Sequence, residues 1–504
     1  MLIRRSVHRR NIRPPRAAAA RGACEIQTLE PRRLLAAAVT AAAPPPWFIT
    51  VGDIAYFGVA GDNGNMSQLW KTDGTPAGTV LVKDINPGGF TNLTPFGGFG
   101  GKLYFSADDG QVGDELWVSD GTEAGTVLLK DINLGPNPSY PQGMFALNDD
   151  TVLFTALDDA LGSELWRTDG TVEGTVLVKD INSGAGSGSP GGYVHFNGAV
   201  YLNANDAAHG EELWRTDGTE AGTYLVKDIN PGAEMSRPSE LTVLNGALVF
   251  AAIDAAAGAE LFRSDGTEAG TALLADIYAG PVSSGPEHFA VLGDKIYFAA
   301  TTAAHGDELW SSDGTAAGTT LVADIYRGFQ SSQPFFINRI GTSILFRAFT
   351  GKSGFELWRY DGRAARMVKD IDRGADSSAP YPMVVLNDVA YFPATTAATG
   401  RELWRSDGAS KGTTLVADLN PGAASSSPAG LTTLGNQLLF VGNFGSGWQV
   451  YASNGTAGGT VPLLTLTPPP PATATPVVAA GVATWPLLDK PDEPSATLVE
   501  LLGL

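Results

Sequence analysis

Residues 212–219 read Glu-Leu-Trp-Arg-Thr-Asp-Gly-Thr, and this stretch decides the fold because it recurs along the chain. An aromatic residue occupies the position of Trp214 nine times, and successive copies lie 46 to 49 residues apart. The nine equivalent residues are Trp70, Trp117, Trp166, Trp214, Phe262, Trp310, Trp358, Trp404 and Tyr451. Self-similarity at a fixed period of this length indicates a repeat architecture in which each copy forms one structural unit.

One copy, residues 241–277, shows how a single unit folds. The dipeptide Asn245-Gly246 separates two apolar runs, and both of its residues tolerate the positive φ of a tight hairpin. A second turn is predicted at Asp265-Gly266-Thr267, where the Asp side chain can bond backbone amides. The four expected strands are residues 241–244, 247–251, 260–264 and 271–277.

Four short antiparallel strands at a period of ~40–50 residues are typical of a β-propeller blade. The second and fourth strands are almost continuously apolar, as expected of strands buried on both faces. We therefore expect an all-β protein, with nine repeats closing into one β-propeller of about nine four-stranded blades. An eight-bladed ring with a leftover repeat and two smaller rings are the alternatives. No linker-like break interrupts the period between the repeats, which disfavours two rings.

The repeats are not identical. The seventh, at 361–366, is two residues short and lacks both Thr of the turn, and the ninth has Asn454 in place of Asp. With these exceptions the copies resemble the ELWxxDGT repeat family, through 115–122, 164–171 and 308–315 as well as 212–219. The resemblance covers roughly residues 48–466. It implies a hyalin-like extracellular or surface protein, in a family whose activities are mostly unassigned.

The N-terminal residues predict export rather than fold. Residues 1–33 are rich in Arg, an apolar run follows at 34–43, and three prolines come next, which is the pattern of a secretory signal peptide. Within this segment, Leu29 to Leu35 read Leu-Glu-Pro-Arg-Arg-Leu-Leu, which resembles the LEPR-XLL sorting segment of some bacterial surface and secreted proteins. We expect a secreted or cell-surface location.

Three domains follow from this reading. Residues 1–45 form the basic leader, residues 46–467 form the repeats of the propeller, and residues 468–504 form a C-terminal tail rich in Pro, Ala and Thr. No segment outside the leader is apolar and long enough to cross a bilayer, so we expect no membrane insertion of the mature chain.

The charge balance narrows the class of partner. Outside residues 1–44 the chain has 24 basic and 51 acidic residues, a net charge of −27. Such a body repels nucleic acid and anionic lipid. A polysaccharide or another surface protein is the expected partner, while the oligomeric state stays open.

The repeated aromatic residues and turns have a structural and a functional interpretation. A row of tryptophans could stack on sugars, but one aromatic residue per blade in mid-strand favours packing between blades. The Asp-Gly-Thr turns could suggest calcium, yet none has the spacing of an EF-hand loop, so we expect turns and leave metal binding unknown. The turns are 73–75, 120–122, 169–171, 217–219, 265–267 and 313–315.

Two sets of carboxylates recur in the same way. Because catalytic carboxylates need unlike environments, sets in equivalent settings argue against acid/base chemistry. The first set is Glu115, Glu164, Glu212, Glu260, Glu308, Glu356 and Glu402, and the second is Asp84, Asp131, Asp180, Asp228, Asp276, Asp324, Asp370 and Asp418. We expect the second set to hold neighbouring turns by hydrogen bonds.

Histidines give no further site. His209 and His305 occupy one variable loop position, His195 and His288 are isolated, and no zinc cluster or catalytic triad can be assembled from the spacing. We therefore predict no catalytic and no cofactor-binding residue, with calcium as a weak possibility.

The favoured function is a non-enzymatic binding or structural scaffold. Two alternatives stay open, a calcium-dependent adhesion module and a propeller enzyme acting on polysaccharide. An enzyme would need polar residues outside the repeat pattern on one rim, for example in loops 106–114, 203–210 and 349–354.

Overall fold

The computed structural model describes residues 48–59, 68–87, 89, 91, 93–443 and 447–466, all within one compact unit, residues 42–504. The predicted leader and its sorting segment, residues 1–45, and the tail, residues 468–504, lie outside the described residues. The 36 strands of the described part form nine four-stranded sheets, each built from one repeat. We number these sheets as blades one to nine in chain order. The prediction of one nine-bladed ring is confirmed, and the eight-bladed and two-ring alternatives are wrong.

The first three blades contain the following strands: β1 (Ile49–Val51), β2 (Ile54–Val59), β3 (Gln68–Thr72) and β4 (Val80–Asp84); β5 (Thr94–Phe99), β6 (Lys102–Asp108), β7 (Asp114–Ser119) and β8 (Val127–Lys130); β9 (Gln142–Ala146), β10 (Val152–Asp158), β11 (Gly162–Thr168) and β12 (Val176–Lys179).

Blades four to six contain β13 (Gly191–Phe196), β14 (Ala199–Asp206), β15 (Gly210–Thr216) and β16 (Tyr224–Lys227); β17 (Ser239–Leu244), β18 (Ala247–Asp254), β19 (Gly258–Ser264) and β20 (Ala272–Ala275); β21 (Glu287–Leu292), β22 (Lys295–Thr302), β23 (Gly306–Ser312) and β24 (Thr320–Ala323).

Blades seven to nine contain β25 (Phe335–Ile340), β26 (Ser343–Thr350), β27 (Gly354–Tyr360) and β28 (Ala365–Lys369); β29 (Val384–Leu386), β30 (Val389–Thr396), β31 (Gly400–Ser406) and β32 (Thr414–Ala417); β33 (Ala429–Leu434), β34 (Gln437–Asn443), β35 (Trp448–Ser453) and β36 (Thr460–Thr465). One 3-10 turn, Ala457–Gly459, precedes β36. None of the helical elements in this part of the chain is long and apolar enough to cross a membrane.

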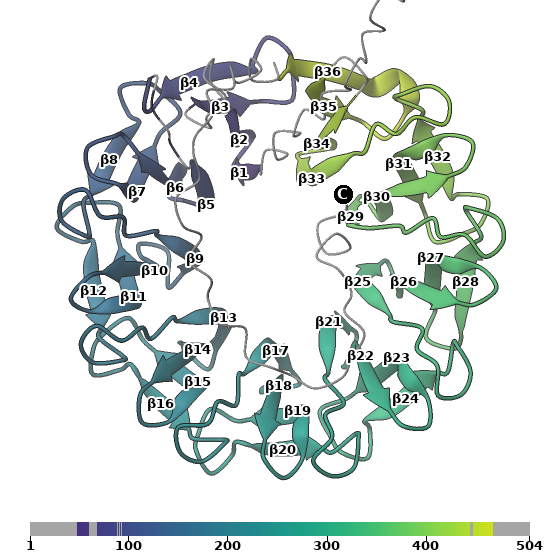
Figure 1. The fold of residues 1–504 in the computed structure, drawn as a ribbon, viewed down its shortest axis with the longest axis horizontal. Coiled ribbons are helices and arrows are strands. Elements are labelled where there is room, and N and C mark those ends of the chain that lie inside the picture. Colours follow the sequence, from purple (N-terminus) through teal and green to yellow (C-terminus); the bar gives the residue numbers. More distant parts are fainter. Residues whose placement is uncertain are drawn as a thin grey trace, which may run out of the picture. The chain divides into compact units, whose positions relative to one another are not determined.

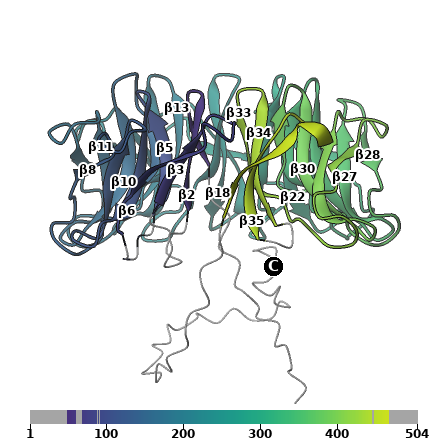
Figure 2. The ribbon, with the colours of Figure 1, turned by 90° about the horizontal axis from the view of Figure 1, so that it is seen from above.

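Within a blade the strands follow one another as an antiparallel meander, with the first strand at the centre of the ring and the fourth at its edge (Figure 1). Seen edge-on, the ring is a single layer of blades (Figure 2). In blade five the hairpin between β17 and β18 turns at Asn245 and Gly246, with φ of 50° and 77°, as their sequence predicts.

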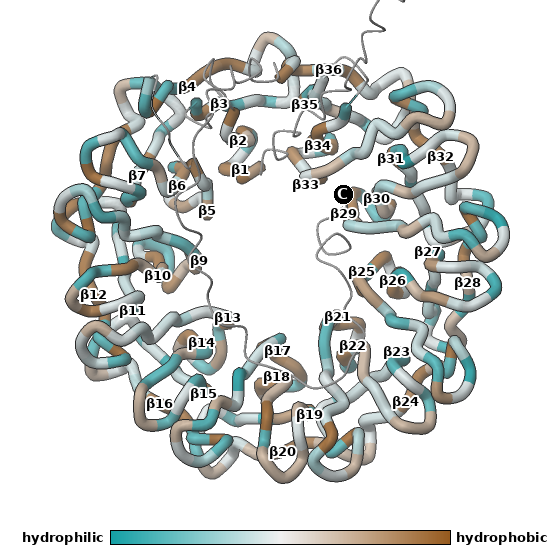
Figure 3. The backbone as a smooth tube through the Cα atoms, in the orientation of Figure 1, coloured by the Kyte–Doolittle hydropathy of each residue, from teal (hydrophilic) through white to brown (hydrophobic). Residues whose placement is uncertain are grey.

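Apolar side chains join each blade to the next. Nine clusters of buried residues each draw on two neighbouring blades; the cluster between blades four and five, for example, includes Tyr201, Leu213, Phe250 and Phe262. Apolar stretches accordingly recur around the ring (Figure 3). Because β18 has six consecutive buried residues, both of its faces are covered, as predicted for a blade strand.

The ring closes by the same kind of packing. Phe48 and Phe57 of blade one share a buried cluster with Leu439 and Val450 of blade nine. Among the described strands, none is exchanged between these blades, since each sheet consists of consecutive strands.

Blade eight, like blade one, has an innermost strand of only three residues. The strand β29 has three residues, whereas β25 in blade seven has six. Pro382 lies just before β29, and Pro393 lies opposite the missing half, on β30. Because proline has no backbone N–H, neither residue can donate to a ladder bond there. The chain at Tyr381 is thus outside the sheet, in the gap next to blade seven.

Candidate functional site

The repeated aromatic residues lie in the cores, as predicted. Six of the nine, including Trp117, Trp214 and Phe262, are less than 9% exposed, and they contact the neighbouring blade. The indole Nε1 of Trp214 has no hydrogen-bond partner. These six rings are therefore packing elements, while Trp70, Trp310 and Trp358 are half-buried.

The motif glutamates hold the connection to the next blade. In blade five, the fully buried carboxylate of Glu260 accepts hydrogen bonds from the N–H of Ile277 (2.8 Å) and from the N–H and hydroxyl of Ser284 (both 2.7 Å). The same serine recurs in every blade that has the motif glutamate except blade three, where the N–H of Gly188 donates instead. These glutamates are structural.

Burial governs the titration of the motif glutamates. Loss of solvent raises the pKa of Glu115, Glu164 and Glu356 to about 7, although the hydrogen bonds that each carboxylate accepts act in the opposite direction. Burial also raises the pKa of the other four, which are Glu212, Glu260, Glu308 and Glu402.

The repeated aspartates make turns. In blade five, Asp265 Oδ1 accepts from the N–H and hydroxyl of Thr267, and Asp276 Oδ2 accepts from the N–H of Gly280. The hydrogen bond to the Thr267 hydroxyl contributes most to lowering the pKa of Asp265. In the part of the chain that the structure describes, no three His, Cys, Asp or Glu residues are grouped as metal ligands.

The two loop histidines each pair within their own repeat. His209 Nδ1 lies 2.9 Å from Asp206 Oδ2, and His305 Nδ1 lies 3.2 Å from Asp324 Oδ2. The hydrogen bond with Asp206 raises the pKa of His209. The structure does not bring the two histidines together.

Two positions that vary between repeats distinguish blades seven and eight. The first lies on the second strand, opposite the Leu of the motif, and the second immediately precedes the motif Glu. The first is Gly58, Ser106, Thr155, Asn203, Ala251, Ala299, Arg347, Pro393 and Val441 in blades one to nine. The second is Asp114, Ser163, Glu211, Ala259, Asp307, Phe355, Arg401 and Trp448 in blades two to nine. Arginine therefore occurs once at each position, in adjacent blades.

Arg347 is half-buried in a cage of aromatic rings. Its guanidinium lies 4.4 Å from the ring centre of Phe355, 4.7 Å from that of Tyr381 and 5.1 Å from that of Phe335. Its Nε is buried and has no hydrogen-bond partner. Burial lowers the pKa of Arg347, and the nearby Tyr381 hydroxyl opposes this effect.

Arg401 approaches the same tyrosine from blade eight. Its guanidinium lies 5.0 Å from the Tyr381 ring centre, and its terminal nitrogens donate to the carbonyls of Ala379 (3.0 Å) and Tyr381 (2.5 Å). Burial lowers the pKa of Arg401; Tyr381 opposes this effect, and the charge of Arg347 adds to it. Phe336 stacks on Tyr381 with ring centres 5.6 Å apart and planes at 10°. We call these six residues the arginine–aromatic site: Phe335, Phe336, Arg347, Phe355, Tyr381 and Arg401.

Titratable residues of blade six adjoin this site. The His288 ring lies 3.9 Å from the Phe335 ring, and its buried Nε2 has no hydrogen-bond partner, although Glu287 Oε1 is 3.7 Å away. Burial, followed by the charge of Glu287, raises the pKa of Asp307 to about 7. The ring of blades thus places His288 against Phe335 of the next blade.

Sequence reasoning missed Arg347 and Arg401, although a signal existed. Aligning the repeats would have shown an arginine at two positions where no other blade has a basic residue. Neither lies in the loops expected to carry function, although Phe349, near Arg347, is the first residue of loop 349–354, and Phe355 follows its last. Such a site can hold a planar anion against aromatic faces.

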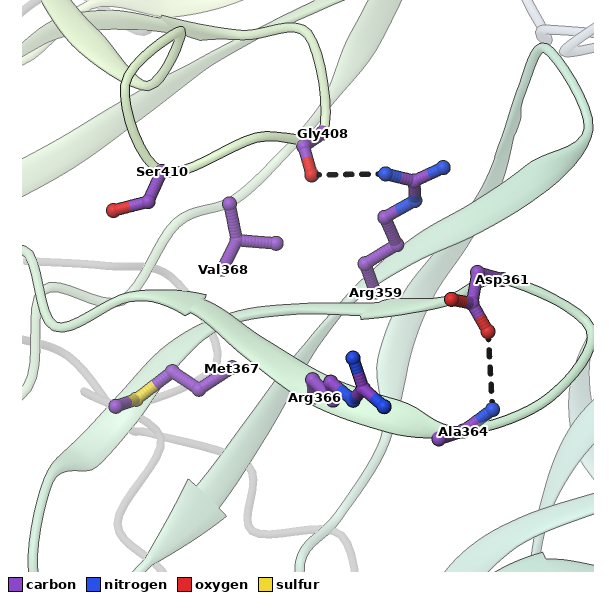
Figure 4. A pocket seen from close by; sticks show the side chains of 8 residues that line it. All are labelled: Arg359, Asp361, Ala364, Arg366, Met367, Val368, Gly408 and Ser410. Carbon is purple, nitrogen blue, oxygen red and sulfur yellow. Dashed lines mark hydrogen bonds between the residues drawn. The ribbon is translucent and has the colours of Figure 1, made fainter.

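A second feature of blade seven lies nearer the edge of the ring. A cleft of about 270 Å³ opens where the shortened turn at Asp361 meets the turn of blade eight (Figure 4). Arg359 donates to the Gly408 carbonyl across it (3.3 Å), and Asp361 Oδ1 accepts from the Ala364 N–H (3.0 Å). The cleft is lined by Arg359, Asp361, Ala364, Arg366, Met367, Val368, Gly408 and Ser410.

Known proteins resemble the chain at a distance. The family model described as outer membrane protein assembly factor BamB matches residues 197–392. No curated protein matches the chain. Among solved structures, a puromycin hydrolase mutant is similar at 16% identity and a TM-score of 0.37 over 70% of this chain and 59% of that one.

Two further structures give similar values. A puromycin-hydrolyzing peptidase of Mycobacterium tuberculosis matches at 12% identity, with a TM-score of 0.37, over 66% of this chain and 54% of that one. A prolyl endopeptidase matches at 12% identity, with a TM-score of 0.40, over 72% and 54%. The chain thus spans between half and two thirds of the length of these structures, and the likeness assigns no activity.

Proposed function

We propose that this chain is a secreted or cell-surface binding propeller of the ELWxxDGT type, which holds an extracellular polysaccharide at the arginine–aromatic site. One observation carries the proposal: in blades seven and eight, residues outside the repeat pattern gather around one tyrosine, and they combine hydrogen-bond donors with exposed parts of aromatic rings. An aromatic face can pack against the C–H face of a sugar ring, while arginine N–H groups donate to its oxygen atoms.

The predicted leader, the LEPR-XLL resemblance and the acidic body support an extracellular place of action. Residues that recur in each blade are engaged in packing and turns, which leaves the non-repeat residues for recognition.

A polysaccharide-binding array tests the proposal. Full-length protein should bind at least one polymer, and Tyr381→Ala should lose that binding while Tyr224→Ala, an exposed aromatic residue of blade four, keeps it. Arrays with calcium and with a chelator separate this function from calcium-dependent adhesion. Binding by wild type and Tyr381→Ala alike would place the ligand elsewhere.

A second candidate function rests on the neighbouring residues of blade six. Burial and the charge of Glu287 raise the pKa of Asp307 to about 7, whereas Glu287 is exposed, so the two carboxyls lie in unlike environments, as acid/base chemistry on a polysaccharide requires. Chromatography of polysaccharides incubated with wild type and with Asp307→Asn tests it. Shortened products that appear only with wild type would establish an enzyme.

A further inference from the structure

We infer that the group recognised at the arginine–aromatic site is a sugar carboxylate, so that the ligand is an acidic, uronate-containing polysaccharide. This inference rests on the proposed function and names its ligand class.

The first step is the lack of a counter-ion. Within the described ranges, every ion pair involves a histidine, and neither Arg347 nor Arg401 has a carboxylate within 4.0 Å. Two half-buried guanidinium groups near one ring repel each other and have lost part of their hydration. An anion bound between them would offset both costs.

The second step is the supply of fixed donors. Arg401 is held by the carbonyls of Ala379 and Tyr381, and Arg347 is held by the three rings around it. A guanidinium whose position is already fixed loses little conformational entropy when it binds a carboxylate through two parallel hydrogen bonds.

The third step is the aromatic surface. The stacked pair of Phe336 and Tyr381 borders the guanidinium groups, and neither ring is fully buried. A sugar ring can lie on such a surface while its carboxylate reaches the arginines. A carboxylate-bearing sugar therefore matches the site better than a free inorganic anion, which would leave the ring faces uncovered.

The fourth step is the local reversal of charge. Residues 335–373 of blade seven contain eight basic and four acidic residues, whereas the equivalent residues 191–229 of blade four contain two basic and six acidic ones. The whole chain has a net charge of −20. A polyanion is repelled by most of the molecule and attracted at blade seven, which makes binding local rather than general.

Calorimetry with the full-length protein tests the inference, using oligogalacturonate, its methyl ester, monomeric galacturonate and dextran sulfate. Wild type should bind oligogalacturonate, and both esterification and Arg347→Met should weaken binding by about tenfold or more. Arg215→Met, in blade four, is the matched control and should bind like wild type. Without ligand, Arg347→Met should melt at or above the wild-type temperature, because it removes an unpaired half-buried charge. That readout separates lost recognition from lost folding.

Three outcomes would overturn the inference. Equal binding of the ester would show a neutral-sugar site, and the proposed function would stand. Equal affinity for the monomer or for dextran sulfate would show a site for small or general anions. Loss of binding in Arg347→Met together with a much lower melting temperature would show a structural arginine. If no polysaccharide binds on the array either, the proposed function fails as well.

Discussion

Blade four and the paired blades seven and eight use the same framework differently. In blade four, Asn203 donates to the carbonyl of Pro238 (3.0 Å), a short bond across to the next blade. In blade seven, Arg347 takes the place of that asparagine, and its long side chain stacks on Tyr381, which the shortened strand β29 leaves outside the sheet. The framework around the two sites is unchanged, since both blades keep the buried Glu and its serine bond.

The comparison separates residues that stabilise the ring in each blade from residues that distinguish blades seven and eight from the others. A side chain that recurs at one position has one structural task, repeated in each blade. Where another residue replaces the recurring side chain at a position that faces the neighbouring blade, it does not have that structural task. The following predictions challenge this division, from the largest expected effect to the smallest.

The first prediction is that the stability of the ring depends on pH, through buried glutamates of both regular and irregular blades. Because burial raises the pKa of Glu115, Glu164 and Glu356 to about 7, each binds its proton more tightly in the folded than in the unfolded chain. Their contribution to stability is complete below the ordinary pKa of 4.5 and is lost as the pH rises through about 7. The melting temperature should therefore fall between about pH 5 and pH 8.

Differential scanning calorimetry across this range measures the effect. High salt controls for repulsion on the acidic surface, because screening weakens exposed charges far more than buried ones. Glu115→Gln should flatten part of the slope. A melting temperature that stays constant or rises towards pH 8 would contradict the prediction.

The second prediction tests a repeated residue in blade four. Trp214→Ala should lower the free energy of unfolding by about 3–5 kcal/mol, because the ring is buried against Val200 and Leu202 and its removal leaves a cavity. Urea denaturation followed by circular dichroism measures it. A variant of unchanged stability that had lost polysaccharide binding would mean that the tryptophans, and not the arginine–aromatic site, contact the ligand.

The third prediction removes one hydrogen bond from the buried carboxylate network. Ser284→Ala should cost about 1.5–3 kcal/mol, because the hydroxyl donates to Glu260 Oε2 at 2.7 Å within the protein. The exposed Ser410 provides the control, Ser410→Ala, which should leave the unfolding midpoint unchanged. Equal midpoints for both variants would show that the backbone N–H alone is sufficient, as it is in blade three.

The smallest effect is expected where blade eight departs from the turn motif. Ala409→Thr should stabilise the ring by about 0.5–1.5 kcal/mol, because in blade three the hydroxyl of Thr171 bonds both Asp169 and the N–H of Gly174. Thr171→Ala should produce the opposite shift of similar size in the same denaturation experiment. Shifts of the same sign would show that the turn hydroxyl is not what stabilises these turns.

The fold can be predicted well from the sequence because the same turn residues and apolar strands recur from repeat to repeat. The Asn245-Gly246 turn, the buried second strand and the blade count all follow from the repeat pattern. The expectation that the fourth strand is buried on both faces was wrong, because this strand lies at the edge of the ring (Figure 1), where β20 has no buried residue. The predicted turns at the repeated aspartates also agree with the structure. The bond between Glu260 and Ser284 could have been found too, because the serine recurs at a nearly constant distance from the glutamate.

Aligned repeats could have singled out Arg347 and Arg401, but not their contact with Tyr381, because the site forms between repeats. Arg347 and Arg401 meet only because blades seven and eight are neighbours in the ring, and Tyr381 reaches them only because Pro382 and Pro393 shorten the ladder. His288 contacts Phe335 for the same reason. Local patterns describe a blade, whereas the contacts between blades depend on their closure into a ring.

The joint between blades nine and one has a consequence for how such rings change in size. Phe57 and Leu439 meet there through side chains alone, and each sheet is encoded by one uninterrupted segment. An in-frame duplication or deletion of about 48 codons would add or remove a complete blade, because no sheet combines strands from distant parts of the chain. The number of blades can therefore change by whole blades during evolution. The variable positions of a new blade can then acquire different side chains.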